Sequence, residues 1–137
     1  MKKTAAGPAG AEQAAGTILV VDDEPAVCYV TGEMLKQQGF PVLCAENGEQ
    51  ALRLFAEHRE RIALLLTDIA MPKLSGPQLA QQLRAQRPGL PVLFISGVVS
   101  PANFEGIMGG WLITKPYGPS SLAAKIREVL RASVSGL

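Results

Sequence analysis

The sequence lacks the features that mark several large classes of protein. No apolar run approaches the roughly 20 residues of a membrane-spanning helix. Aromatic residues make up 5% of the chain, and it has one histidine, His58. There are 13 basic and 12 acidic residues, so the net charge of +1 gives no general attraction to nucleic acid or to an anionic membrane. We therefore expect neither a membrane nor a nucleic-acid partner for this chain.

Cysteine is also scarce, with two residues and no CxxC pattern, which excludes a disulfide framework and a cysteine-rich metal site. Cys28 falls in a helical pattern, and Cys44 lies at the end of an apolar run. We predict two small buried thiols in a reducing compartment. The segment Met1–Gly16 begins with two lysines but continues with small and polar residues, so it is not predicted to be a signal peptide. We expect a cytoplasmic protein.

The chain has the size of one domain, with 137 residues. Hydrophobic residues at 47% and charged residues at 18% are typical of a folded globular protein. We predict a flexible leader or linker over residues 1–16, one domain over residues 17–132, and a C-terminal tail over residues 133–137.

Five short apolar runs have the length and composition of buried strands. They are Ile18–Val21, Val42–Ala45, Ile62–Leu66, Val92–Ile95 and Trp111–Ile113. Because segments of helical period separate them, the sequence predicts an α/β fold in which helices cover both faces of a parallel sheet.

The helical segments carry recognisable start and stop signals. In the first, Val27, Val30, Met34 and Leu35 are predicted to share one face, and Gly39 ends the helix. The second and third begin at Asn47 and Ser75, each with glutamine three residues on, which is the pattern of a capping box. The last begins near Pro119. The crossover Ser100–Gly110 is rich in glycine, so we expect one or two mobile turns there.

Polar residues follow four of the five predicted strands. Asp22 and Asp23 follow the first, Asp68 the third, Ser96 the fourth, and Lys115 comes shortly after the fifth. Since ligands of such sheets bind beyond the carboxyl ends of the strands, these side chains form the candidate site. Any one of them alone is better explained as a turn former, a helix cap or a solvated charge, but their conjunction favours a functional site.

Three carboxylates at one edge of a sheet repel one another strongly unless a cation neutralises them. Hard oxygen ligands with room for water suit Mg²⁺. A carboxylate can act as a nucleophile toward phosphorus, so Asp68 is the candidate acceptor of a phosphoryl group. Mg²⁺, the ammonium of Lys115 and the hydroxyl of Ser96 would each neutralise or bind one phosphoryl oxygen.

The same residues match a family. The chain resembles the receiver domains of two-component response regulators, over about residues 17–132. The matching stretches, in order, are ILVVDDEP at Ile18–Pro25, LLLTDIAMPKLSG at Leu64–Gly76, VLFISG at Val92–Gly97 and ITKPY at Ile113–Tyr117. The resemblance implies a flavodoxin-like, doubly wound (βα)5 three-layer sandwich whose five parallel strands have the order 2-1-3-4-5.

The resemblance also implies roles for individual residues. Asp68 would be phosphorylated by a histidine kinase or a histidine phosphotransfer domain. Asp22 and Asp23 would hold Mg²⁺ with Asp68 and the backbone carbonyl of Ala70. Ser96 would be the switch hydroxyl, and Lys115, preceding a cis-proline, would pair with the phosphoryl group.

The sequence departs from the family at Leu112, where an aromatic switch residue is usual. The adjacent Trp111 is predicted to face the opposite side of the strand. Neither Ala70 nor Val98, at positions that influence hydrolysis of the aspartyl phosphate in the family, can orient water through its side chain. We therefore predict no special acceleration of self-dephosphorylation, and no other enzyme activity. The weak fourth crossover resembles receivers attached to sensor histidine kinases.

Three alternatives compete with a phosphorylated receiver. A phosphatase that forms an aspartyl phosphate needs an acid two residues after Asp68, where the chain has Ala70. A flavin-binding module needs a phosphate-binding loop after the first strand, where acidic residues would repel a phosphate. A degenerate receiver would serve only as a protein-interaction module. Since no DNA-binding segment follows Leu130, we expect the output to run through a downstream protein partner.

Overall fold

The computed structural model describes residues 16–97 and 111–135. These residues form five strands and four helices that alternate along most of the chain. The strands are β1 (Thr17–Val21), β2 (Val42–Ala45), β3 (Ile62–Asp68), β4 (Val92–Ser96) and β5 (Trp111–Thr114). The helices are α2 (Pro25–Gln37), α3 (Gly48–His58), α4 (Gly76–Gln86) and α6 (Pro119–Ser135). The predicted crossover at 100–110 and Val98 lie outside the described residues. Of the predicted leader, only Gly16 is described.

The strands form one parallel sheet of order β2-β1-β3-β4-β5, which confirms the predicted topology. The three inner strands are nearly all buried, whereas the edge strands β2 and β5 are partly exposed. Inner strands of a parallel sheet are covered on both faces, which is why they are apolar at consecutive positions rather than at alternate ones.

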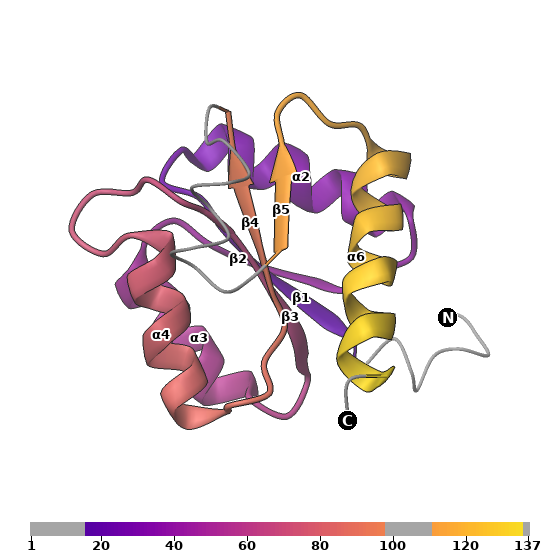
Figure 1. Ribbon diagram of the computed structural model, residues 1–137. Coiled ribbons are helices and arrows are strands. Elements are labelled where there is room, and N and C mark those ends of the chain that lie inside the picture. Colours follow the sequence, from indigo (N-terminus) through magenta and orange to yellow (C-terminus); the bar gives the residue numbers. More distant parts are fainter. Residues whose placement is uncertain (1–15, 98–110, 136–137) are drawn as a thin grey trace.

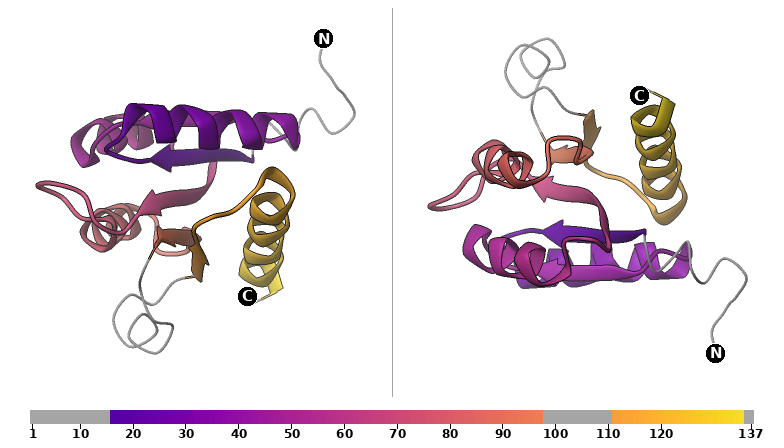
Figure 2. Two further views of the ribbon diagram at one scale, coloured as in Figure 1. Left: turned by 90° about the horizontal axis from the view of Figure 1, so that it is seen from above. Right: turned by 90° about the horizontal axis from the view of Figure 1, so that it is seen from below.

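Two hydrophobic clusters lie on opposite faces of the sheet. Under α3 and α4, Phe55, Leu79 and Leu83 pack against Leu65 and Phe94. On the other face, under α2 and α6, the helix residues Leu35, Ile126 and Val129 pack against alternate strand residues such as Leu64 and Leu66. Figures 1 and 2 show these helices on both sides of the sheet. All the strands run in one direction, so their carboxyl ends meet at one edge, toward the top of Figure 1.

Local signals fix where the helices begin and end. Ser75 and Gln78 form a complete capping box at the start of α4, as predicted. At α3, Asn47 accepts a hydrogen bond from the backbone N–H of Gln50, but the Gln50 side chain bonds Glu46 rather than Asn47, so the predicted box is half formed. After α2, Gly39 has a φ of 93°, which favours glycine and ends the helix.

The face that α2 buries differs from the predicted one. Its buried residues are Cys28, Thr31, Gly32 and Leu35, whereas Val30 is 50% exposed. The buried residues recur with the expected helical period, but the buried face includes Thr31 in place of Val30. Small and polar residues lie against the sheet because the hydroxyl of Thr31 has a partner there: its Oγ1 lies 2.9 Å from the hydroxyl of Tyr117.

The prediction for the cysteines is wrong for one of the two. Cys28 is buried, but Cys44 is exposed. Cys44 lies on the edge strand β2, which has a neighbouring strand on one side only, and its sulfur lies beside Gly32 of α2. Among the described residues, no helix has the length and apolar character needed to cross a membrane.

Candidate functional site

Three carboxylates meet where β1 and β3 end. Asp22 and Asp23 follow β1, and Asp68 is the last residue of β3. The two strands are neighbours, with Val21 aligned to Thr67, so the residues that follow lie side by side. One carboxylate oxygen from each aspartate lies within 4.8 Å of the others, an arrangement that could hold a metal ion. The sheet thus brings together the three acids that the sequence predicts to share a site.

Asp22 is the most enclosed of the three, with 1% of its surface exposed. Its Oδ1 accepts a hydrogen bond of 2.9 Å from the backbone N–H of Glu24. Its Oδ2 is buried and has no hydrogen-bond partner in the described part of the chain. Burial raises the pKa of the Asp22 carboxyl, and the negative charges of Asp68 and Asp23 add to that rise. A buried oxygen without a partner is costly, so it points to a missing ligand.

Asp68 is half-buried at the centre of the same edge. Burial raises the pKa of its carboxyl, and the charges of Asp23 and Glu24 act in the same direction. The positive charge of Lys115 and a hydrogen bond from the backbone N–H of Ile69 both lower that pKa. Asp68 therefore lies between acidic neighbours that disfavour its charged form and a cation that favours it.

Lys115 and Ser96 come from the other half of the sheet. Ser96 is buried, ends β4 and is aligned with Thr114 of β5. The next residue, Lys115, is exposed, and its backbone N–H donates to the carbonyl of Ser96 at 3.0 Å. The positive charge of its ammonium lowers the pKa of both Asp22 and Asp68. The Lys115–Pro116 peptide bond is cis, as predicted.

The loop after Asp68 is held tightly over the end of β3. Ala70 is exposed two residues beyond Asp68. The backbone N–H of Gly76 donates to the carbonyl of Ile69 at 2.8 Å. A Cβ atom at Gly76 would lie 2.2 Å from the carbonyl oxygen of Asp68, so only glycine allows α4 to begin this close to the strand.

Comparison with known proteins agrees with this geometry. The family model described as the response regulator receiver domain matches residues 18–127. The chain belongs to the response regulator receiver family. Its fold, with the strand order 2-1-3-4-5, is the receiver fold.

Curated relatives of this receiver domain are longer regulatory proteins. The chain is 32% identical over 121 residues to the alkaline phosphatase synthesis transcriptional regulatory protein PhoP of Bacillus subtilis, covering 85% of this chain and 49% of that protein. It is 30% identical over 121 residues to the transcriptional regulatory protein GlrR of Escherichia coli, covering 85% of this chain and 26% of that one. The chain therefore spans half or less of the length of these two relatives.

Solved structures give the same picture. A response regulator receiver domain protein from Clostridium thermocellum superposes with a TM-score of 0.79 at 26% identity, covering 89% of this chain and 99% of that one. The receiver domain of the hybrid histidine kinase CckA superposes with a TM-score of 0.71 at 36% identity, covering 84% and 99%. Receiver domains of separate regulators and of hybrid kinases are thus both similar to this chain.

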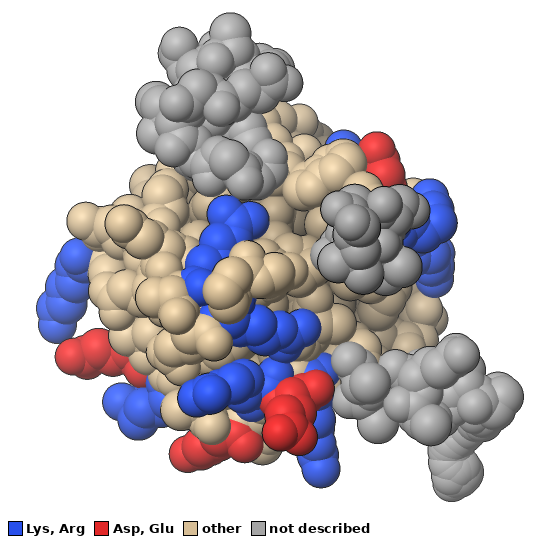
Figure 3. Space-filling view, turned by 60° about the horizontal axis from the view of Figure 1, so that its bottom comes forward, with Lys and Arg blue, Asp and Glu red and all other residues tan. Residues whose placement is uncertain are grey.

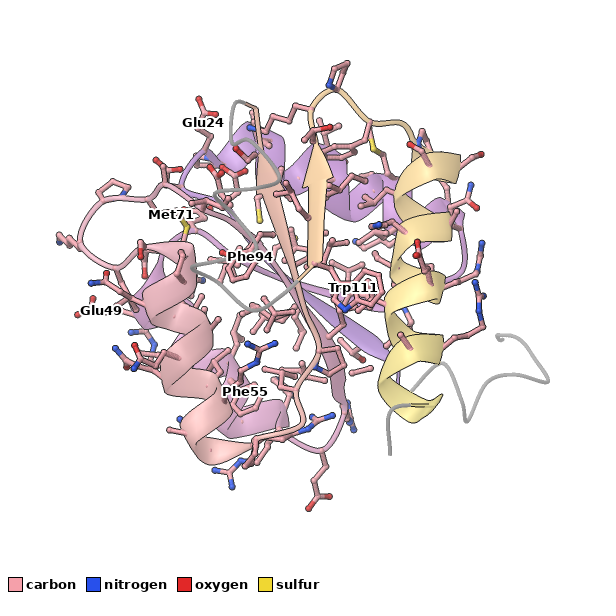
Figure 4. All side chains as sticks on the ribbon, in the orientation of Figure 1. Glu24, Glu49, Phe55, Met71, Phe94 and Trp111 are labelled. Carbon is pink, nitrogen blue, oxygen red and sulfur yellow. The ribbon has the colours of Figure 1, made fainter. Side chains whose placement is uncertain are left out.

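Two features of this receiver domain were not predicted from its sequence. Tyr117, just after the cis-proline, shares a hydrogen bond with Thr31 of α2 and so fixes the loop that carries Lys115. A pocket of about 510 Å³ lies beside the acidic site, between the N-terminal end of α3 and the loop that joins β3 to α4; its lining includes Asp23, Asn47 and Met71. Figure 4 shows Met71 and Glu24 at the same end of the sheet. Both features depend on pairings between segments distant in the sequence.

Leu112 and Trp111 face opposite sides of the sheet, as predicted. Leu112 packs against the hydrophobic cluster under α3 and α4, whereas Trp111 packs on the other face with α6. The Nζ of Lys125 lies 5.2 Å from the centre of the Trp111 ring, and Figure 4 shows the ring beside α6. Trp111 is therefore held by α6 and does not replace the missing aromatic residue.

Proposed function

We propose that this receiver domain accepts a phosphoryl group on Asp68, from a histidine kinase or a histidine phosphotransfer domain, in a reaction that depends on Mg²⁺. The observation that carries the proposal is the triad Asp22, Asp23 and Asp68, whose oxygens lie within 4.8 Å of one another. The unpartnered Oδ2 of Asp22 is a second, independent reason to expect a cation there.

The residues present fit a magnesium ion. Asp22, Asp23, Asp68 and the backbone carbonyl of Ala70 would supply oxygen ligands, the kind that Mg²⁺ prefers, with the remaining positions taken by water or by phosphoryl oxygens. When bound, the ion neutralises negative charge on the acids and on the incoming phosphoryl group.

In the transfer, the protein's side chains mainly position the phosphoryl group and neutralise its negative charge. A carboxylate oxygen of Asp68 forms the new bond to phosphorus while the bond from phosphorus to the donor nitrogen breaks and the imidazole leaves. The ammonium of Lys115 and the hydroxyl of Ser96 bind phosphoryl oxygens as that bond forms. The low exposure of Ser96 favours a strong hydrogen bond at this point.

The donor has to come from another protein or domain. His58, the one histidine of the chain, ends the 11-residue helix α3, whose N-terminal end lines the pocket beside Asp23. At 1.5 Å per residue, the helix separates His58 from that end by about 16 Å. The phosphorylated domain would then signal through contacts with a downstream protein.

A receiver that only binds a protein partner, without phosphorylation, is the second candidate. The observation in its favour is Leu112, which packs in the hydrophobic core at the position where the family usually has an aromatic switch residue. The acidic triad argues against it, because a scaffold has no use for three carboxylates whose oxygens lie within 4.8 Å of one another.

The test is incubation with acetyl phosphate and Mg²⁺ followed by intact mass spectrometry. We expect a gain of one phosphoryl group, and loss of that gain in Asp68→Asn or when EDTA removes the metal. Glu24→Gln is the matched control, because Glu24 is an exposed acid at the same edge that lies outside the triad. No gain in the wild-type protein, or an equal gain in Asp68→Asn, would refute the proposal and favour the protein-binding scaffold.

A further inference from the structure

The two cysteines lie against each other at the edge of the sheet. Cys28 is on α2 and buried; Cys44 is on the edge strand β2 and exposed. The Sγ of Cys44 lies 3.6 Å from the backbone carbonyl oxygen of Cys28, and the Sγ of Cys28 lies 3.5 Å from the carbonyl oxygen of Ala45, the neighbour of Cys44. Each thiol thus lies beside the backbone of the segment that carries the other cysteine, and one of the two residues is exposed while the other is buried.

Gly32 lets α2 and β2 approach each other closely at this point. A Cβ atom at that position would lie 3.1 Å from the Sγ of Cys44, tighter than ordinary van der Waals contact. A larger residue on this turn of α2 would crowd the thiol, whereas glycine lets the helix and the strand come this close. Cys44 therefore lies near the helix that carries Cys28 while remaining exposed on the edge strand.

The electrostatic environment divides the two thiols further. The neighbouring thiol of Cys28 lowers the pKa of Cys44 to about 7, and the positive charge of Lys36 acts in the same direction. Burial and the charges of Glu33 and Glu46 oppose that lowering. The interaction with Cys44, together with burial, raises the pKa of Cys28. Since the thiolate is the reactive form, Cys44 is the nucleophile of the pair.

We propose that Cys44 and Cys28 are a modification site for hydroperoxides, in which Cys44 is oxidised first and Cys28 then closes a disulfide between β2 and α2. This inference stands on the close packing of the two cysteines between α2 and β2 and on their unequal exposure. It does not depend on the proposed phosphorylation of Asp68.

The chemistry balances with hydrogen peroxide as the oxidant. The sulfur of Cys44 attacks one peroxide oxygen, the O–O bond breaks, and the leaving hydroxide takes up the thiol proton as water, leaving a sulfenic acid. The sulfur of Cys28 then attacks the sulfur of Cys44, the S–O bond breaks, and the departing oxygen leaves as water with the Cys28 proton. Two thiols and one peroxide give one disulfide and two waters.

Residue Lys36 makes the product easy to map. Trypsin cleaves after Lys36, so Cys28 and Cys44 fall in separate peptides, 4–36 and 37–53. After treatment of the wild-type protein with hydrogen peroxide and alkylation of free thiols, we expect these two peptides to appear joined by a disulfide. Reduction should separate them. This measurement uses the native sequence, so it does not depend on any variant folding.

Two variants resolve the order of events. In Cys28→Ala we expect peroxide to leave a sulfenic acid on Cys44 that dimedone traps. In Cys44→Ala, whose replaced side chain is exposed, we expect no oxidation of Cys28 under the same conditions. Circular dichroism checks that each variant is folded.

Either of two results would overturn the proposal. One is that both thiols of the folded wild-type protein stay reduced in peroxide. The other is that the oxidised protein is a dimer joined through Cys44, with no bond to Cys28, which would make Cys44 an isolated surface thiol.

Discussion

Charged side chains at the two ends of the sheet differ in whether they have partners. At the carboxyl end, three aspartates crowd together and one buried oxygen has no partner among the described residues. At the amino end, arginines bind backbone carbonyls: Arg87 donates to the carbonyl oxygens of Arg59, at 2.9 Å, and Ile62, and Arg84 donates to that of Leu90 at 3.2 Å. Figure 3, which brings the bottom of the molecule forward, shows basic side chains gathered there with acidic ones between them.

This difference indicates that charged residues at the amino end contribute to stability and those at the carboxyl end to function. Charged donors that bind carbonyls at the ends of strands and loops stabilise the fold, because both partners are satisfied. Like charges that lack a counter-ion destabilise it, and a protein tolerates them where a ligand supplies the missing charge. We therefore expect changes at the amino end to alter stability alone, and changes at the carboxyl end to alter function, sometimes with a gain in stability.

The largest effect is expected for Gly76→Ala. The added Cβ would meet backbone atoms of Asp68 and Ile69, which cannot move aside without displacing the Asp68 carboxylate. We expect a loss of at least about 3 kcal/mol of unfolding free energy and a fall in phosphorylation by acetyl phosphate. The control is Gly89→Ala at the other end of the sheet, where a Cβ meets nothing within 4 Å and a change within about 0.5 kcal/mol is expected. Equal urea midpoints for the two variants would contradict this.

Arg87→Ala should lower stability and leave phosphorylation unchanged. The substitution removes a half-buried charged donor and leaves the carbonyls of Arg59 and Ile62 without this partner, at a cost of about 2 kcal/mol. Urea unfolding measures the loss, and the rate of phosphorylation by acetyl phosphate gives the second readout. Arg61→Ala, an exposed arginine at the same end, is the control. If Arg87→Ala slowed phosphorylation of the folded protein, the division between the two ends would not hold.

Asp22→Asn should stabilise the metal-free protein by about 1 kcal/mol at pH 7, because it removes a buried charge from beside two others. The amide oxygen can still accept the hydrogen bond from Glu24. The pKa of Asp22 is raised above its ordinary value of 3.8, so the folded state binds its proton more tightly than the unfolded state does. Its contribution to stability is therefore greatest at low pH and is lost as pH rises through the folded pKa.

The measurement is urea unfolding in EDTA from pH 4 to pH 7. The wild-type protein should lose more stability over this range than Asp22→Asn does. Glu24→Gln, which changes an exposed acid nearby, should follow the wild-type profile. A variant that is less stable than the wild type at pH 7 would show that the carboxylate of Asp22 is satisfied without a metal.

Much of the fold could be predicted from the sequence because its signals are local. Inner strands of a parallel sheet appear as continuous apolar runs, so the five runs located all five strands. The Ser75 and Gln78 pair located the start of α4. The candidate site followed from topology, since parallel strands bring the residues after their carboxyl ends to one edge.

The remaining features depend on partners distant in the chain. Thr31 is buried in place of the predicted Val30 because its hydroxyl meets Tyr117, 86 residues away. Cys44 is exposed because β2 lies at the edge of the sheet, with a neighbouring strand on one side only. The unpartnered oxygen of Asp22 is likewise a result of packing, since sequence alone cannot say which carboxylate is enclosed.

The most direct test of the acidic triad is urea unfolding of the wild-type protein at pH 7 with and without Mg²⁺, at matched ionic strength. A ligand that binds only the folded state raises the unfolding free energy by RT ln(1 + [L]/Kd). The account predicts a midpoint that rises with Mg²⁺ in the wild type and shifts far less in Asp22→Asn. A midpoint that Mg²⁺ leaves unchanged in the wild-type protein would contradict it.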